Sequence, residues 1–236
     1  MLESLRNKKI LVVVAHPDDE LLGIGGTINR LVKEYCCLVK VIILGEGITS
    51  REQKRDTERW KMELGQHRKN IFQAKSAIDY QEVSICDFPD NRFDSVDILD
   101  IIKVVEKEKQ KFKPEIIFTH HGGDLNIDHQ RTCDAVITAC RPMEQETVKM
   151  IVCFETPSCT EWRSSADPKH FTPNFFIEIS KDNLDAKIRG MEAYSFEKRT
   201  YPHPRSPEAL TVLAQRWGVA IGRKYAEAFM IIRLIS

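Results

Sequence analysis

The most constraining feature of the sequence is a short stretch near its start, Lys9–Val14, that is continuously apolar after its first residue and rich in β-branched side chains. A strand that is apolar at successive positions is buried on both faces, as in a parallel sheet. A stretch with helical spacing follows at Glu20–Tyr35, and a second apolar run follows at Leu38–Leu44. A strand, a helix and a strand in this order favour a parallel sheet covered by helices.

The same alternation continues along the chain. Further strands are expected at Val83–Cys86, Glu115–Thr119, Lys149–Phe154, Phe175–Ile179 and Ala228–Leu234. Further helices are expected at Lys54–Ala77, Val96–Phe112, His129–Cys140, Asn183–Tyr194 and Glu208–Arg223, and a long loop at Thr156–Pro173. The pattern contains no internal repeat. It therefore predicts one domain over residues 1–236, an α/β fold of the Rossmann-like kind, with a mostly parallel sheet and helices on both faces.

Composition excludes several classes of function. Lys+Arg and Asp+Glu both number 35, so the formal net charge is 0, which argues against the dominant basic surface of a nucleic-acid-binding protein. Apolar runs such as Ile10–Ala15 are far shorter than the roughly 20 residues of a membrane-spanning helix, so no integral membrane association is expected. The seven cysteines are an odd number, and no secretory signal is visible. We therefore expect reduced thiols and a cytoplasmic location, and a homo-oligomer is compatible with these features.

Directly after the first expected strand, the segment AHPDDE places His16, Asp18 and Asp19 at a strand-to-helix turn. Ligands of open α/β sheets bind at this end of the strands. Imidazole nitrogens and carboxylate oxygens suit zinc, with one position left open for water. The alternative is that Asp18 or Asp19 only caps the following helix, because Asp is a common capping residue.

A second polar cluster, His120–His129, follows the expected strand Glu115–Thr119. Because both clusters follow parallel strands, they can face each other across the same edge of the sheet. Two such clusters are harder to explain as helix caps than one. His129 would then complete a site with three protein ligands.

These segments resemble a known family. AHPDDE after the first strand, NIDH further along and PHPRSPEAL…YAEAF near the end are similar to motifs of the PIG-L/LmbE-like zinc-dependent de-N-acetylases, and the resemblance spans nearly the whole chain. It implies that His16, Asp19 and His129 bind Zn²⁺, although Fe²⁺ or another divalent ion fits the same ligands.

The resemblance also implies roles for residues around the metal. Asp18 would be the general base and Asp128 a catalytic group that orients its partners. Arg51 would bind the substrate near its carbonyl group. In this mechanism a zinc-activated water attacks an amide carbonyl, Asp18 takes the proton of the water, and zinc and Arg51 stabilise the developing oxyanion.

One position departs from the pattern of the family. Many members have histidine where this chain has Asn126, and an amide donates a hydrogen bond but carries no positive charge. Asn126 is expected to contact the substrate, and His120, His121 or His203 to supply the missing imidazole. His203 is the catalytic residue that we favour over a plain surface-turn role, because the tail motif around it resembles that of the family and the two flanking prolines restrict its backbone.

Together these features predict a zinc-dependent hydrolase that removes an N-acetyl group from an amino sugar, including a nucleotide-linked or otherwise conjugated sugar. Two alternatives remain at this stage. One is a zinc amidase that acts on a non-sugar or thiol-conjugate amide. The other is a sugar-binding protein without catalytic activity, which the joint presence of His16, Asp18, Asp19 and His129 disfavours.

Overall fold

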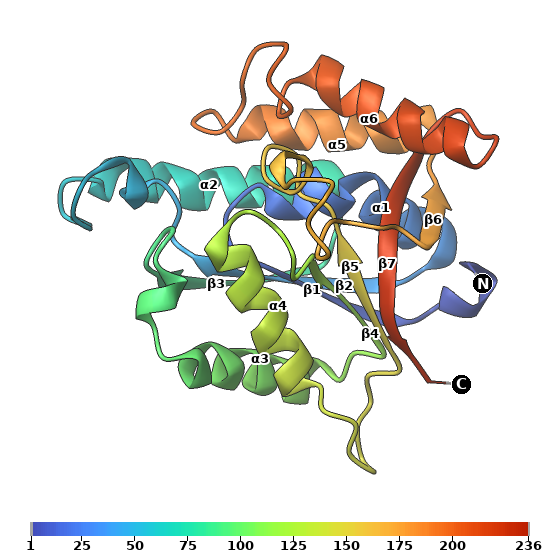
Figure 1. Ribbon diagram of the computed structural model, residues 1–236, viewed down its shortest axis with the longest axis horizontal. Helices are drawn as coiled ribbons and strands as arrows, with labels where there is room; N and C mark the ends of the chain where they lie inside the picture. Colours follow the sequence, from blue (N-terminus) through green and yellow to red (C-terminus); the bar gives the residue numbers. More distant parts are fainter. Residues whose placement is uncertain (1, 236) are drawn as a thin grey trace.

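A seven-stranded sheet forms the centre of the computed structural model, which describes residues 2–235 (Figure 1). The strands are β1 (Lys9–Val14), β2 (Leu38–Gly45), β3 (Glu82–Phe88), β4 (Ile116–His120), β5 (Met150–Phe154), β6 (Phe175–Glu178) and β7 (Ala226–Leu234). Their order is β3-β2-β1-β4-β5-β7-β6. Strands β1 to β5 pair in parallel, and β7 runs antiparallel to both β5 and β6. The expected α/β fold with a mostly parallel sheet is confirmed.

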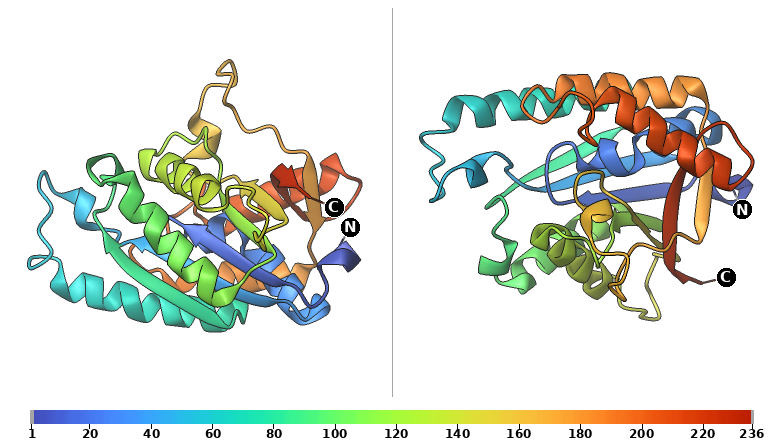
Figure 2. Two further views of the ribbon diagram at one scale, coloured as in Figure 1. Left: turned by 90° about the horizontal axis from the view of Figure 1, so that it is seen from below. Right: turned by 45° about the horizontal axis from the view of Figure 1, so that its top comes forward.

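Six helices cover the two faces of the sheet in the described part of the chain. They are α1 (Asp19–Tyr35), α2 (Lys61–Ile78), α3 (Ile98–Phe112), α4 (Ile127–Ala139), α5 (Lys181–Ala193) and α6 (Pro207–Ala220). Helices α1, α2, α5 and α6 lie on one face, and α3 and α4 lie on the other (Figures 1 and 2). None of these helices combines the length and apolar character needed to cross a bilayer.

The continuous apolar pattern of β1 follows from this layering. Val12 and Val14 belong to the core under α1, α2 and α5, whereas Leu11 and Val13 belong to the core under α3 and α4. Successive side chains of a strand point to opposite faces, so a strand covered on both sides needs an apolar residue at each position.

The order of the strands fixes where a ligand can bind. From β1 the chain adds β2 and β3 in one direction, and later adds β4 and β5 in the other. Loops that leave β1 and β4 therefore diverge to opposite faces and open a crevice at the carboxyl ends of these two strands. AHPDDE follows β1 and the cluster His120–His129 begins at the end of β4, so the fold brings both motifs to this point.

Several expected helix boundaries differ from the structure, including those of α3, which begins at Ile98, and α5, which begins at Lys181. Helix α2 begins at Lys61 rather than Lys54, because the preceding residues form turns in which the Asp56 carboxylate accepts the Arg59 amide. Helix α4 begins at Ile127 rather than His129, so His129 lies in its first turn. Helix α6 ends at Ala220, and Gly222 behind it has a φ of 67°, which ends a helix at little cost.

Helix α1 packs closely on β5, and Gly23 is the point of contact. A Cβ atom at Gly23 would collide with the ring of Phe154 at the end of β5. Gly65, on the exposed side of α2, is its natural counterpart, since a Cβ atom there meets nothing within 4 Å. Substitution by alanine at Gly23 therefore tests the packing contact, and the same substitution at Gly65 tests only the helix propensity of glycine.

We expect Gly23→Ala to lower the free energy of unfolding by about 1–3 kcal/mol, because overpacking the contact forces Phe154 or α1 to move. Gly65→Ala should instead raise it by about 0.5–1 kcal/mol, the usual gain from glycine to alanine in an exposed helix. Urea unfolding of the two variants measures both changes. A stabilising Gly23→Ala would contradict the close packing of α1 on β5.

Candidate active site

The two motifs predicted from the sequence meet at the crevice between β1 and β4. His16 lies in the turn after β1, Asp19 is the first residue of α1, and His129 is in the first turn of α4. Each of these three residues offers one ligand atom, and the three atoms lie within 4.8 Å of one another. All three come from the ends of elements that the buried sheet fixes in place.

Asp19 is the centre of this arrangement. Its buried Oδ2 lies 3.4 Å from His16 Nδ1, 3.3 Å from His120 Nε2 and 3.4 Å from His129 Nε2. The same oxygen accepts the backbone amide of His16 at 2.8 Å, which closes the turn. Burial opposes ionisation, but the His129 ring outweighs it and holds the pKa of Asp19 well below its usual range.

The rings of His16 and His129 each have a second carboxylate on the side away from Asp19. Asp128 Oδ2 lies 2.9 Å from His16 Nε2, and its Oδ1 accepts the Phe93 amide at 2.8 Å. Asp124 Oδ1 lies 3.2 Å from His129 Nδ1. A carboxylate behind a histidine fixes its orientation and the nitrogen that carries the proton. The nitrogens that face Asp19 are therefore His16 Nδ1 and His129 Nε2.

The His129 ring is buried, yet within the described chain neither of its nitrogens makes a hydrogen bond of good geometry. Burial lowers the pKa of His129, but the Asp19 and Asp124 carboxylates overcome it and raise the pKa to about 9. A positive charge thus belongs between these carboxylates. A divalent metal ion is the cation that two imidazoles and a carboxylate hold best, so the residues fit a zinc-type site.

His120 does not take part as a ligand. The Ala15 amide donates a hydrogen bond to its Nε2 at 2.9 Å, and its Nδ1 lies 2.9 Å from the Thr156 hydroxyl. An amide can only donate, so the lone pair of Nε2 is used and the proton is on Nδ1. Burial, together with His129, lowers the pKa of His120 to about 4, which keeps the ring neutral.

His121 is also held away from the site. Its Nε2 lies 2.7 Å from the carbonyl oxygen of Lys169, so this nitrogen carries a proton and donates it. Its ring packs edge-on against Phe171. Of the three histidines considered as substitutes for the family imidazole, only His203 lines one of the two cavities beside the site.

Asp18 has an unusual backbone. Its φ of 104° lies in the left-handed region, which is unfavourable for a residue with a side chain. The Glu20 carboxylate accepts its amide, and the Tyr194 hydroxyl in turn donates to Glu20 at 2.6 Å. This conformation turns the Asp18 carboxylate away from Asp19 toward Arg205, whose Nη1 donates to it at 3.1 Å.

Arg205 connects Asp18 to the opposite wall. Its guanidinium also donates to Glu197 at 2.9 Å and to the Ser158 hydroxyl at 2.8 Å. Burial raises the pKa of the Asp18 carboxyl well above its ordinary value, and Arg205 partly opposes that rise. A raised pKa makes a carboxylate a stronger base, which a proton acceptor requires.

A cavity of about 100 Å³ opens beside these residues. His16 and Asp18 form its inner wall, and Arg51 and Asn126 form part of its rim. A second cavity of about 240 Å³ adjoins it, since Arg51, Glu197 and Arg205 line both. His203 and Trp162 line only the outer cavity.

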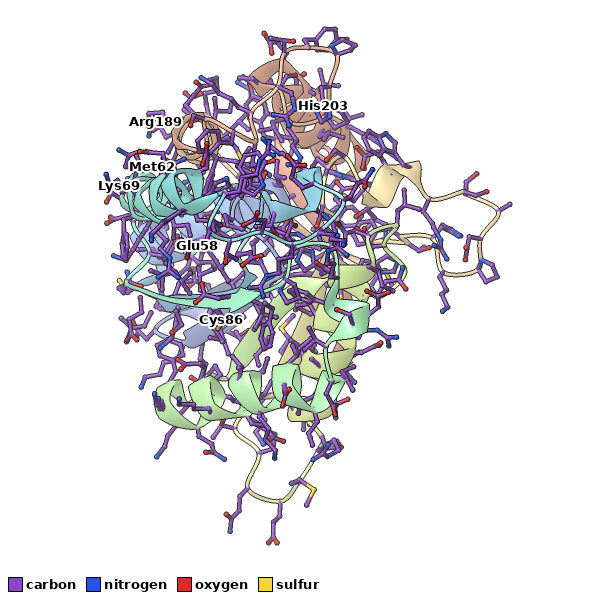
Figure 3. All side chains as sticks on the ribbon, turned by 90° about the vertical axis from the view of Figure 1, so that its left-hand side faces the viewer. Glu58, Met62, Lys69, Cys86, Arg189 and His203 are labelled. Atoms are coloured by element: carbon purple, nitrogen blue, oxygen red, sulfur yellow. The ribbon has the colours of Figure 1, made fainter. Side chains whose placement is uncertain are left out.

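The three remaining sequence candidates have defined contacts. Asn126 caps α4: its Oδ1 accepts the Asp128 amide and its Nδ2 donates to Asn91, both at 2.8 Å. Arg51 donates to Glu197 at 2.8 Å. His203 lies in the loop between α5 and α6 (Figure 3). Its Nδ1 accepts the Arg205 amide at 3.2 Å, which leaves its proton on Nε2.

Comparison with known proteins identifies the family. Residues 11–140, more than half of the chain, match the family model described as PIG-L, GlcNAc-PI de-N-acetylase. The chain belongs to the PIG-L family. The resemblance predicted from its motifs is thereby confirmed, and the match covers most of β1, the AHPDDE and NIDH motifs and α4.

One curated relative covers most of this PIG-L chain. The uncharacterized deacetylase YaiS of Escherichia coli is 26% identical over 198 residues, which are 80% of this chain and 91% of YaiS.

Two solved structures show that the fold extends over nearly all of this PIG-L family member. The N,N'-diacetylchitobiose deacetylase of Pyrococcus horikoshii has a TM-score of 0.74 at 18% identity, covering 96% of this chain and 84% of the other. GalB of Pseudomonas putida, a 4-carboxy-2-hydroxymuconate hydratase, has a TM-score of 0.73 at 18% identity, covering 97% and 98%. The fold therefore supports more than one reaction, and the function must be argued from the site.

Sequence reasoning missed several residues at the centre of this PIG-L site. Arg205 and Asp124 lie inside the quoted motifs but were not singled out, and Glu197 lies in a segment without any motif. Asp90 looks like an ordinary turn residue, yet its Oδ1 lies 3.5 Å from His16 Nε2. A charged residue among small and polar neighbours in a motif was the available signal for Arg205 and Asp124; Glu197 offered none.

The contact between Asp18 and Arg205 predicts energetic coupling. Arg205→Met should cost about 3–5 kcal/mol of stability, because it leaves two carboxyl groups without their cation in a buried position. In an Asp18→Asn background the same substitution should cost less, by about 0.5–3 kcal/mol. Urea unfolding with a chelator present measures the cycle. Arg199→Met, at an exposed arginine of the same loop, is the control and should change stability by less than about 0.5 kcal/mol. Equal costs in both backgrounds would contradict the coupling.

Proposed function

We propose that the protein is a metal-dependent hydrolase that removes an N-acetyl group from an amino sugar, including nucleotide-linked and otherwise conjugated sugars. The observation that carries the proposal is the buried set of His16 Nδ1, Asp19 Oδ2 and His129 Nε2, in which His129 has no hydrogen-bond partner among the described residues. The catalytic carboxyl Asp18 and an open cavity stand beside it.

His16, Asp19 and His129 would hold the metal, with Zn²⁺ the expected ion and Fe²⁺ or another divalent ion compatible with the same donors. A divalent ion in such a site acts as a Lewis acid that lowers the pKa of water and polarises a carbonyl group. The Asp128 carboxylate would position His16, because it accepts the proton of Nε2 and leaves the lone pair of Nδ1 for the ion.

Asp18 would act as the general base. It is adjacent to a ligand, yet its carboxylate faces Arg205 and lines the cavity. Asp18 takes the proton of the water whose oxygen bonds to the acetyl carbonyl carbon. The bond from carbon to nitrogen then breaks, and Asp18 returns the proton to the leaving amine. Acetate and the free amino sugar are the products.

The substrate would occupy the two adjoining cavities. Arg51, which lines both, would contact the acetyl oxygen or a sugar hydroxyl. Asn126 uses one amide hydrogen on Asn91, and the other is available to the substrate. His203, with its proton on Nε2, would donate a neutral hydrogen bond from the outer cavity. It would thus take over part of the role of the imidazole that Asn126 replaces.

The family model and the deacetylases among the similar proteins support this reading over the alternatives. An amidase for non-sugar amides would share the metal and Asp18 but act on a different panel of substrates. A sugar-binding protein without activity would have no use for a base beside a metal. The deciding experiment measures acetate release from N-acetylglucosamine, diacetylchitobiose, nucleotide-linked N-acetyl sugars and N-acetylcysteine. Release from the thiol compound alone, or from none of them with metal present, would overturn the proposal.

The metal assignment predicts the composition of the purified protein. We expect about one divalent ion per chain, and His129→Ala should remove most of it because the variant loses one of three ligands. His170→Ala, at an exposed histidine, is the matched control and should retain the ion. Elemental analysis after gel filtration measures both. Full occupancy in His129→Ala would refute the assignment.

The proton-transfer assignment separates metal binding from turnover. Asp18→Asn should retain the metal while kcat falls by about 10²–10⁴-fold, the usual size of a general-base effect. His203→Ala should retain the metal and lose about tenfold or more in kcat through the lost hydrogen bond, with partial recovery when Asn126→His is added. Steady-state kinetics and metal content decide the matter. Loss of metal in Asp18→Asn would make it a ligand, and an unchanged kcat in His203→Ala would remove that residue from the mechanism.

A further inference from the structure

His129 borders a second group of donor atoms that the proposed chemistry does not use. Asp124, His129 and Cys159 each offer one ligand atom, and these atoms lie within 4.8 Å of one another. The nitrogen of His129 on this side is Nδ1, which lies 3.2 Å from Asp124 Oδ1. We call these three residues the Cys159 site. It lies on the opposite side of the His129 ring from Asp19.

Burial and hydrogen bonding make the Cys159 site more than a cysteine beside an acid. His129 is buried, and within the described residues its Nδ1 makes no hydrogen bond of good geometry, although it points at Asp124. Asp124 is itself fixed, because its Oδ1 accepts the Asn126 amide at 2.8 Å and its Oδ2 accepts the Thr160 hydroxyl at 2.5 Å. The fixed Asp124 carboxylate and the His129 Nδ1 that faces it at 3.2 Å are therefore two ligand atoms already in place.

Cys159 adds a sulfur ligand to this pair. It is partly exposed, and its backbone amide is held by the carbonyl of Thr156, at the start of the turn that leads into the 3₁₀ helix Thr160–Trp162. Thiolate sulfur favours Zn²⁺ and still softer ions over Mg²⁺ or Ca²⁺. The set of one sulfur, one nitrogen and one oxygen therefore selects for thiophilic ions.

We infer that Asp124, His129 and Cys159 form a second metal site, specific for thiophilic divalent ions such as Zn²⁺ in excess or Cd²⁺, and that its occupation inhibits the enzyme. Binding releases the thiol proton to solvent. A neutral imidazole offers a lone pair from only one nitrogen. An ion on Nδ1 thus leaves the proton of His129 on Nε2, and the ring can no longer serve the ion at Asp19.

Two tautomers of one histidine then distinguish two states. With the proton on Nδ1, facing Asp124, His129 serves the catalytic site. With the proton on Nε2, facing Asp19, it serves the Cys159 site. The inhibitory part of this inference rests on the proposed function, whereas the binding part does not.

The binding experiment uses Cd²⁺ alone with metal-free protein and follows the ultraviolet charge-transfer band of cadmium bound to thiolate. Wild type and His16→Ala should both show the band, since His16 belongs only to the catalytic site. Cys159→Ser should lose the band. Cys36→Ser, at an exposed cysteine distant in sequence from Cys159, should keep it. A band that persists in Cys159→Ser, or that disappears in His16→Ala, would overturn the second site.

The inhibition experiment titrates Cd²⁺ or excess Zn²⁺ into the metal-loaded enzyme. Cys159→Ser should keep the wild-type rate without added ion and need at least about tenfold more ion for half inhibition, whereas Cys36→Ser should behave like wild type. Equal sensitivity of wild type and Cys159→Ser would overturn the inhibitory role. If no substrate is turned over at all, the proposed function fails, and the cadmium band still decides whether the second site exists.

Discussion

The arrangement of the whole site depends on one buried carboxylate whose negative charge must be compensated by neighbouring groups. Asp19 sits at the start of α1, away from solvent, with its Oδ2 within 3.4 Å of nitrogens from three imidazoles. A buried charge is tolerated only when partners compensate it. The fold meets that need with residues from two separate strand ends, and Asp124 and Asp128 then orient two of the three rings. The requirement of Asp19 thus organises residues that are more than a hundred positions apart in sequence.

The sequence was sufficient to predict the sheet and to bring the residues of the candidate site together, for a simple reason. Apolar runs such as Lys9–Val14 have to be buried on both faces, and this forces a layered α/β fold. In such a fold the residues directly after β1 and β4 must be neighbours, so His16, Asp19 and His129 could be grouped without coordinates. Helix ends were predicted less well. At α4, for example, the capping of Asp128 by Asn126 moves the start of the helix, which periodicity does not reveal.

What the sequence could not supply is the direction in which each polar side chain points. His120 and His121 lie in the same polar cluster as His129. However, the Ala15 amide contacts a ring nitrogen of His120, and the Lys169 carbonyl contacts one of His121, so these nitrogens are not available as ligands or acids. Arg205 reaches Asp18 across 187 positions, through a contact that depends on the left-handed backbone of Asp18. Contacts of this kind arise from tertiary packing, and no spacing rule encodes them.

The cap of α4 has a consequence for how the site can change over evolutionary time. Asn126 stabilises the first turn of the helix that carries Asp128 and His129, and the same side chain faces the cavity. Exchanging asparagine for a residue that caps poorly typically costs about 1 kcal/mol of stability. Replacing Asn126 by histidine would therefore add an imidazole to the site but weaken the cap of α4, and the reverse exchange would have the opposite effects. Loss of an imidazole at position 126 is tolerated best when His203 is already present at the outer cavity. The need to cap α4 therefore constrains the order in which such substitutions can accumulate.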